Sequence, residues 1–186
     1  YKIERMGFSF DKKSPEVRAI LDHVEEMESR GYHYEGADAS FEMLVRRVLG
    51  KYQPFFKLIS FRVAVERTSS GEMISEAAIK LMVGDELEHA VAEGDGPVNA
   101  LDLALRKALD RFYPTLRGMR LSDFKVRVIN ARAGTAAAVR VLVESSDGKE
   151  VWNTVGVSEN LIEASWEALV DAIEYKLCET SPGESA

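Results

Sequence analysis

The chain has 186 residues, of which 46% are hydrophobic and 30% are charged, and its formal net charge is −7. This composition is typical of a globular protein with enough apolar side chains for one large core, or for a core and a smaller helical part. The negative charge argues against non-specific nucleic-acid binding, which clustered Lys and Arg provide. No apolar run approaches the roughly 18 residues that a membrane-spanning helix needs, and no signal peptide is visible.

The first 54 residues have helical character and form the first predicted part of the chain. The Ser14-Pro15 pair is typical of a helix N-terminus and Gly31 of a helix end. Between them, apolar residues recur at helical spacing: Val17, Ile20, Leu21, Val24 and Met27. A linker over residues 32–36 leads to a second helix from about Asp38. Two short helices bury too little apolar surface to fold alone, so we expect them to pack on the following region, a partner chain or an absent neighbour.

From Phe56 onward the apolar pattern changes to a period of two, which predicts β-strands. Three strand-like runs precede an amphipathic helix, and the same order then recurs. The runs cover residues 56–66, 77–83 and 87–91 before the helix at 97–112, and residues 124–128, 139–143 and 151–157 before the helix at 160–178.

The two predicted helices align residue by residue. An offset of 64 places Ala100, Ala104, Leu105, Ala108 and Leu109 on Ala164, Ala168, Leu169, Ala172 and Ile173. We therefore predict an α+β fold of duplicated βββα units about a pseudo-twofold axis, preceded by a small helical linker subdomain. The predicted parts are 1–54, 55–180 and a disordered tail at 181–186.

Candidate catalytic groups are scarce in this sequence. His23, His33 and His89 are far apart and lack the spacing of a metal-binding pair. No Gly-x-Ser-x-Gly motif marks a nucleophilic serine. The single cysteine, Cys178, cannot form an internal disulfide, which favours a reducing, cytoplasmic location. We predict no catalytic residue and no metal site in this chain. Because the sequence begins at Tyr1 without an initiator Met, we expect a fragment of a longer polypeptide.

The Gly94-Asp95-Gly96-Pro97 turn is the most chemically suggestive feature. Its glycines permit positive φ and a close backbone approach, and proline suits the first helical turn. Free N–H groups at such a helix start can receive a carboxylate. The alternative is a tight strand-to-helix connection whose glycines serve geometry alone.

Three segments together resemble the C-terminal regulatory domain of the 2-isopropylmalate synthase and citramalate synthase family. They are the turn and helix start Gly94-Asp95-Gly96-Pro97-Val98-Asn99-Ala100-Leu101, the segment Trp152 to Trp166 with its Asn-Thr-Val-Gly-Val-Ser motif, and the linker Gly31 to Glu42. The resemblance covers nearly the whole chain. The sequence of the second segment resembles the citramalate branch more than the leucine-pathway branch.

This resemblance implies a two-part enzyme of which only the control part is present. In the family, a TIM barrel with a divalent metal condenses acetyl-CoA with pyruvate or 2-oxoisovalerate. The His-x-His and Asp-Arg-Glu motifs of that barrel do not occur in this sequence. The C-terminal domain dimerises and binds isoleucine or leucine, which inhibits the distant active site. We therefore expect a homodimer, an amino-acid effector, a catalytic barrel in the same polypeptide and no cofactor in this chain.

The resemblance also implies which residues form the effector pocket, although each of them can instead belong to the core. The set comprises both strand-to-helix turns and one apolar strand wall: Gly94, Asp95, Gly96, Val98, Ala100, Leu121, Phe124, Val128, Gly156, Val157, Asn160 and Ile162. The family usually has Tyr at the position of Phe124. The alternatives are the same domain in the leucine pathway, a free-standing amino-acid sensor and a structural dimerisation module without an effector.

Overall fold

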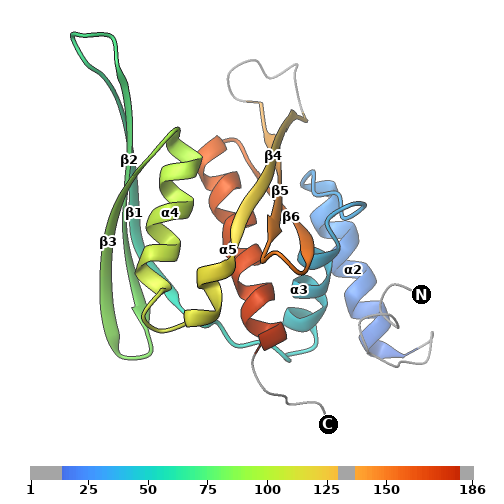
Figure 1. Cartoon of the computed structure of the whole chain (residues 1–186). Helices are drawn as coiled ribbons and strands as arrows, with labels where there is room; N and C mark the ends of the chain where they lie inside the picture. The colour runs from blue at the N-terminus through green and yellow to red at the C-terminus, as the bar shows by residue number, and fades with distance from the viewer. Residues whose placement is uncertain (1–13, 130–136, 181–186) are drawn as a thin grey trace. The chain divides into compact units, whose positions relative to one another are not determined.

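The computed structural model describes residues 14–129 and 137–180. Two helices, α2 (Pro15–Ser29) and α3 (Asp38–Val48), precede two βββα repeats (Figure 1). The chain divides into two compact units. The first contains the helical segment up to Gln53, Ser122–Ser145 and Val151–Tyr175, and the second contains Pro54–Leu121, Ser146–Glu150 and the chain from Lys176. The tail predicted to be disordered, residues 181–186, lies outside the described residues.

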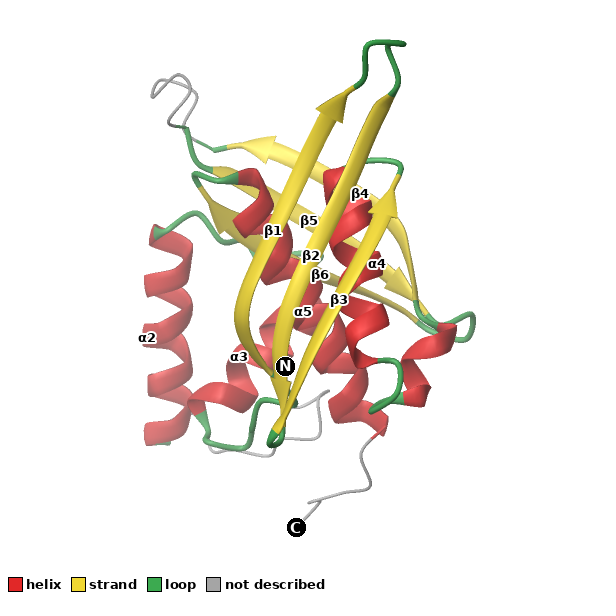
Figure 2. Cartoon of the chain, turned by 90° about the vertical axis from the view of Figure 1, so that its left-hand side faces the viewer, coloured by secondary structure: helices red, strands yellow, loops and turns green. Residues whose placement is uncertain are grey.

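The first repeat is a three-stranded antiparallel sheet, in the order β1-β2-β3, with one helix on one face. Its elements are β1 (Lys57–Arg67), β2 (Met73–Val83), β3 (Glu86–Gly94) and α4 (Pro97–Leu109), followed by the short 3-10 helix η1 (Pro114–Gly118). Alternate residues of β2 and one stripe of α4 are fully buried: Ala77, Ile79 and Leu81 with Leu101, Leu105 and Ala108. The sheet lies beside α4 in Figure 2, which shows its uncovered face toward the viewer.

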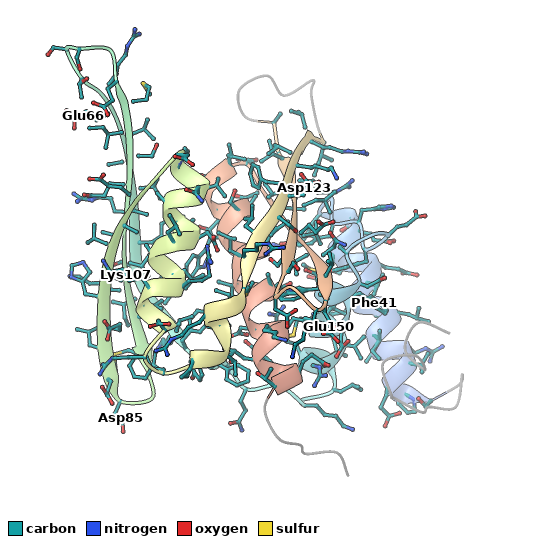
Figure 3. All side chains as sticks on the ribbon, viewed as in Figure 1. Phe41, Glu66, Asp85, Lys107, Asp123 and Glu150 are labelled. Carbon is teal, nitrogen blue, oxygen red and sulfur yellow. The ribbon has the colours of Figure 1, made fainter. Side chains whose placement is uncertain are left out.

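The β1–β2 hairpin is longer than the helix that covers it. Glu66 lies near the hairpin tip beyond the end of α4, and Asp85 lies at the opposite end of the sheet (Figure 3). Lys107 points from α4 toward β3 in the same view, and its Nζ donates to the carbonyl oxygen of Val91 at 3.0 Å. The helix is thus fastened to the edge strand β3 by a side chain as well as by apolar packing.

The second repeat has the same order of elements. It consists of β4 (Arg120–Val128), β5 (Val139–Ser146), β6 (Val151–Ser158) and α5 (Leu161–Thr180), and its sheet has the order β4-β5-β6. The predicted offset of 64 places Pro97 at the start of α4 on Leu161 at the start of α5. The predicted α+β fold of duplicated βββα units is therefore confirmed.

A regular ladder joins β6 to α5. Trp152 Nε1 donates to the carbonyl oxygen of Ala172 at 3.0 Å, and Thr154 Oγ1 donates to that of Ala168 at 2.7 Å. Two strand residues and four helix residues advance by nearly the same distance, about 6 to 7 Å. Each second residue of β6 therefore meets the next turn of α5.

The helical segment packs on the second repeat, at the outer edge of β6. Ile20, Tyr32 and Tyr34 form one core cluster with Val155 and Val157 of the strand. The structure shows the helical segment packed on the repeat region, which is one of the three partners that the sequence left open. No helix in the described part of the chain is long and apolar enough to cross a membrane.

Candidate functional site

The first strand-to-helix junction leaves the start of α4 open. Gly96 is the N-cap of α4, with φ −164° and ψ 171°, and no side chain caps the helix there. The Asn99 side chain, which would be within reach of the helix start, instead accepts from the N–H of Asp95 at 3.1 Å. Because Pro97 has no N–H, the exposed donors of the first turn are those of Val98 and Asn99. A carboxylate or other anion is the natural partner for such donors.

The two glycines of this junction have different reasons to be glycine, and neither has positive φ. A Cβ on Gly94 would lie 2.5 Å from the backbone nitrogen of Ala100, so the strand approaches the helix too closely for any side chain. A Cβ on Gly96 would meet nothing within 4 Å. Of the two roles that the sequence allowed for these glycines, positive φ occurs at neither, and close backbone approach occurs at Gly94. Gly94 serves close approach, and Gly96 keeps the space at the helix start open.

The second junction is closed by its own side chains. Asn160 Oδ1 accepts from the N–H groups of Ile162, at 2.8 Å, and Glu163, at 3.3 Å. Ser158 Oγ accepts from the N–H of Asn160 at 3.1 Å. The donors at the start of α5 are therefore already used, in contrast to those of α4. The repeats share a fold but differ in their capacity to bind an anion at the helix start.

Gly156 is a close-packing position. A Cβ there would lie 2.0 Å from the carbonyl oxygen of Ala164, so α5 rests directly on the backbone of β6. Val157 is buried and packs against the helical segment. These two residues hold elements together, and their predicted role in an effector pocket stays a prediction.

The predicted apolar wall lies on β4. Ser122 Oγ donates to Glu144 Oε1 at 2.8 Å, so Ser122 and Glu144 share one side of the sheet. Strand alternation places Phe124 and Val128 on that side and Leu121 on the other. Phe124 is half-buried, and Val128 is 57% exposed. The alternation thus separates Leu121 from the other two predicted wall residues.

The predicted pocket residues fall evenly into the two units. Gly94, Asp95, Gly96, Val98, Ala100 and Leu121 belong to one, and Phe124, Val128, Gly156, Val157, Asn160 and Ile162 belong to the other. The residues of each strand-to-helix turn thus stay together in one unit. Among them, Ala100 is fully buried, and Val98 and Ile162 are half-buried.

A polar cluster that the sequence analysis missed lies between α5 and the helical segment. Asp171 accepts from Ser40 Oγ at 2.7 Å and from Arg47 Nη2 at 2.6 Å. Glu167 Oε2 accepts from the Tyr32 hydroxyl at 2.5 Å. Burial raises the pKa of Asp171, and burial together with the adjacent Glu167 raises the pKa of Tyr32. The available signal was the four-residue spacing of Glu167 and Asp171, which puts both carboxylates on one face of a helix.

No group of three or more His, Cys, Asp or Glu side chains in residues 14–129 and 137–180 is arranged to hold a metal ion.

Comparison with known proteins gives a consistent relationship. The family model described as the LeuA allosteric (dimerisation) domain matches residues 35–177. The (R)-citramalate synthase of Geobacter sulfurreducens is 52% identical over 177 residues, which are 95% of this chain and 34% of that protein. The (R)-citramalate synthase of Aquifex aeolicus is 49% identical over 178 residues, 95% of this chain and 34% of that protein. The 2-isopropylmalate synthase of Aquifex aeolicus is 30% identical over 176 residues, 92% of this chain and 30% of that protein. The chain spans about a third of the length of these curated relatives.

Proposed function

This chain belongs to the LeuA allosteric (dimerisation) domain family, and from that premise we propose that it is the effector-binding and dimerisation domain of an acetyl-CoA-dependent 2-keto-acid condensing enzyme. The catalytic work, with its divalent metal, belongs to a barrel in the same polypeptide. The domain binds the end-product amino acid of the pathway and thereby inhibits that distant active site. Such inhibition requires an effector with different affinities for two states of the whole enzyme.

The observation that carries the effector proposal is the open helix start at Gly96. The N–H groups of Val98 and Asn99 receive no side-chain cap, whereas Asn160 caps the corresponding helix of the second repeat. Donors at a helix N-terminus favour a carboxylate. The carboxylate is common to all amino acids, so selectivity resides in an apolar wall, for which Val98 in the same unit as this helix start is the candidate.

We assign the full-length enzyme to the citramalate branch, with isoleucine as the effector. The support is the difference in identity, 52% and 49% to two (R)-citramalate synthases against 30% to a 2-isopropylmalate synthase. The alternative is the same domain of a leucine-pathway enzyme, with leucine as the effector.

Isothermal titration of the purified chain with isoleucine, leucine and valine tests this proposal. We expect saturable binding with isoleucine strongest. Leucine as the strongest ligand would move the chain to the leucine pathway. Absence of binding by all three amino acids would leave a dimerisation module without an effector, and sedimentation would then establish whether the dimer persists.

A further inference from the structure

A cavity of about 410 Å³ lies inside the unit that contains the helical segment. One wall comes from α2, the linker after it and α3, and the other comes from β6 and α5. Its volume falls within the range of small-molecule sites, about 300 to 1,000 Å³. None of the residues predicted to bind the effector lines it.

The floor of the cavity is aromatic and aliphatic. Tyr32, Tyr34, Leu44 and Trp166 are each more than nine-tenths buried and line it. The Tyr34 residue is 7% exposed, and its hydroxyl makes no hydrogen bond to any described residue. Burial raises the pKa of Tyr34, and the nearby charges of Asp171, Arg47 and Arg30 also act on it. Because Tyr34 lines the cavity, its hydroxyl can hydrogen-bond a polar group of a ligand there.

Most charges around the cavity are already neutralised within the protein. Asp171 is held by Arg47 and Ser40, and Glu167 accepts from Tyr32 and from the N–H of Val157 at 3.0 Å. These groups fix the two walls together, and a ligand would have to break an existing bond to use them.

Two charges at the rim have no ion-pair partner among the described residues. Arg30, at the end of α2, lies with its guanidinium 6.0 Å from the ring centre of Tyr32. Its Nη1 donates to the Met27 sulfur at 3.6 Å. Glu163 is exposed in the first turn of α5. Both line the cavity, the cation on one wall and the carboxylate on the other.

We propose that this cavity binds an amphipathic zwitterion, such as an α-amino acid with a large apolar side chain. The apolar part rests on Leu44 and the aromatic floor, the carboxylate pairs with Arg30, and the ammonium group pairs with Glu163. Because the ligand then contacts both walls, its binding holds the helical segment against α5. This site does not use the open start of α4, so the inference stands or falls independently of the proposed function.

The test compares L-phenylalanine with two analogues that each lack one charge, by titration of the chain. 3-Phenylpropionate lacks the ammonium group and phenethylamine lacks the carboxylate. We expect each analogue to bind about three- to tenfold more weakly than phenylalanine, because each lacks one charged, hydrogen-bonded contact that lies near solvent. Phenethylamine binding as tightly as phenylalanine would overturn the assignment of Arg30.

Two rim variants and one matched control refine the test. Arg30→Gln should weaken the binding of phenylalanine and 3-phenylpropionate but leave that of phenethylamine unchanged. Glu163→Gln should weaken the binding of phenylalanine and phenethylamine but leave that of 3-phenylpropionate unchanged. Arg62→Gln is the control, because Arg62 is 76% exposed on β1 in the other unit. On ligand saturation, amide exchange should slow over residues 30–37. The proposal fails if phenylalanine does not bind at millimolar concentration, or if neither rim variant changes its affinity.

A Gly96→Val variant separates this site from the effector site. Phenylalanine binding that survives this substitution, while isoleucine binding is lost, supports two separate sites. Loss of both ligands would assign phenylalanine to the start of α4 and overturn the cavity proposal.

Discussion

Gly94 and Gly96 are two residues apart, yet a side chain would do different things at each. At Gly94 a Cβ would collide with the backbone nitrogen of Ala100, whereas at Gly96 it would enter open space. Gly96 has extended backbone angles that any residue adopts. The space beside Gly96 is also the space through which an anion would reach the N–H groups of α4.

We therefore predict opposite outcomes for the same substitution at the two glycines. Gly94→Val should lower the free energy of unfolding by about 1 to 3 kcal/mol, because the helix start must shift. Gly96→Val should cost less than about 1 kcal/mol but should weaken isoleucine binding, since its side chain obstructs the donors. Urea unfolding and calorimetric titration of both variants measure these effects. If Gly96→Val binds isoleucine as the unaltered chain does, the effector carboxylate lies elsewhere.

At the scale of single elements, two backbone N–H groups of the edge strand β6 donate to side chains that lie outside its sheet. The N–H of Val155 donates to Ser40 Oγ at 3.0 Å, and the N–H of Val157 donates to Glu167 Oε2. An edge strand otherwise presents unpaired donors that recruit another strand. α3 and α5 thus both support β6 and cover its open edge.

Ser40→Ala tests how much the contacts of Ser40 at the β6 edge stabilise the fold. The substitution removes the acceptor of the Val155 N–H and a donor to Asp171 in a buried location, so we expect a loss of about 1 to 3 kcal/mol in unfolding free energy. Amide exchange at Val155 should accelerate. Ser29→Ala on the exposed end of α2 is the control, because the Ser29 hydroxyl donates to the carbonyl oxygen of Glu26 at the surface, within its own helix. Equal effects of the two substitutions would show that the β6 edge gains nothing from Ser40.

The β5–β6 hairpin has its own link to α5, through Asp147. Its carboxylate accepts from Lys176 Nζ at 2.6 Å and from the N–H groups of Lys149 and Glu150 at 2.9 and 2.8 Å. The bond from Lys176, followed by the two backbone bonds, holds the pKa of Asp147 well below its ordinary range.

Because the pKa of Asp147 is lower in the folded chain than in the unfolded chain, its contribution to stability is complete above the unfolded value, about 3.9. That contribution is lost as pH falls through the folded value. Asp147→Asn keeps an oxygen for the turn but loses the charge, so its stability should fall less steeply with acidification below about pH 4. Chemical unfolding of both proteins between pH 2 and 7 provides the measurement. Parallel curves would exclude a charge-dependent link between the hairpin and α5.

Periodicity predicts the elements of this fold well because each repeat has one strongly alternating sheet face and one apolar helix stripe. Ile79 and Leu81 on a strand, or Leu101 and Leu105 on a helix, carry that signal in the sequence itself. The packing of the helical segment on β6 depends on contacts of Ser40 with Asp171 and Val155, each of which is more than a hundred residues from Ser40 in the chain. The sequence could not separate the two possible roles of the glycines at the first turn, because a glycine required for close approach looks the same in sequence as one required for its backbone angles.

At the scale of the whole molecule, each of the two sheets has a strip of exposed apolar side chains on one face. On the first sheet, Leu87 is 60% exposed, pairs with Met82 across the strands and lies on the face away from α4. On β4 of the second sheet, Val126 and Val128 are 42% and 57% exposed on one side. Large exposed apolar patches mark association surfaces, and the family description names dimerisation.

We predict that these strips form the surface between two copies of the chain. A double variant, Leu87→Asp with Val128→Asp, introduces a charge into each strip and should raise the dimer dissociation constant at least about tenfold, since burying an unpaired carboxylate costs more than 1.4 kcal/mol. Leu21→Asp is the matched control, because Leu21 is 54% exposed on α2 and belongs to neither strip. Sedimentation equilibrium over a range of concentrations, with circular dichroism to check the fold, distinguishes the three proteins. A double variant that dimerises as tightly as the control would mean that the copies meet elsewhere and that these strips face another part of the full-length enzyme.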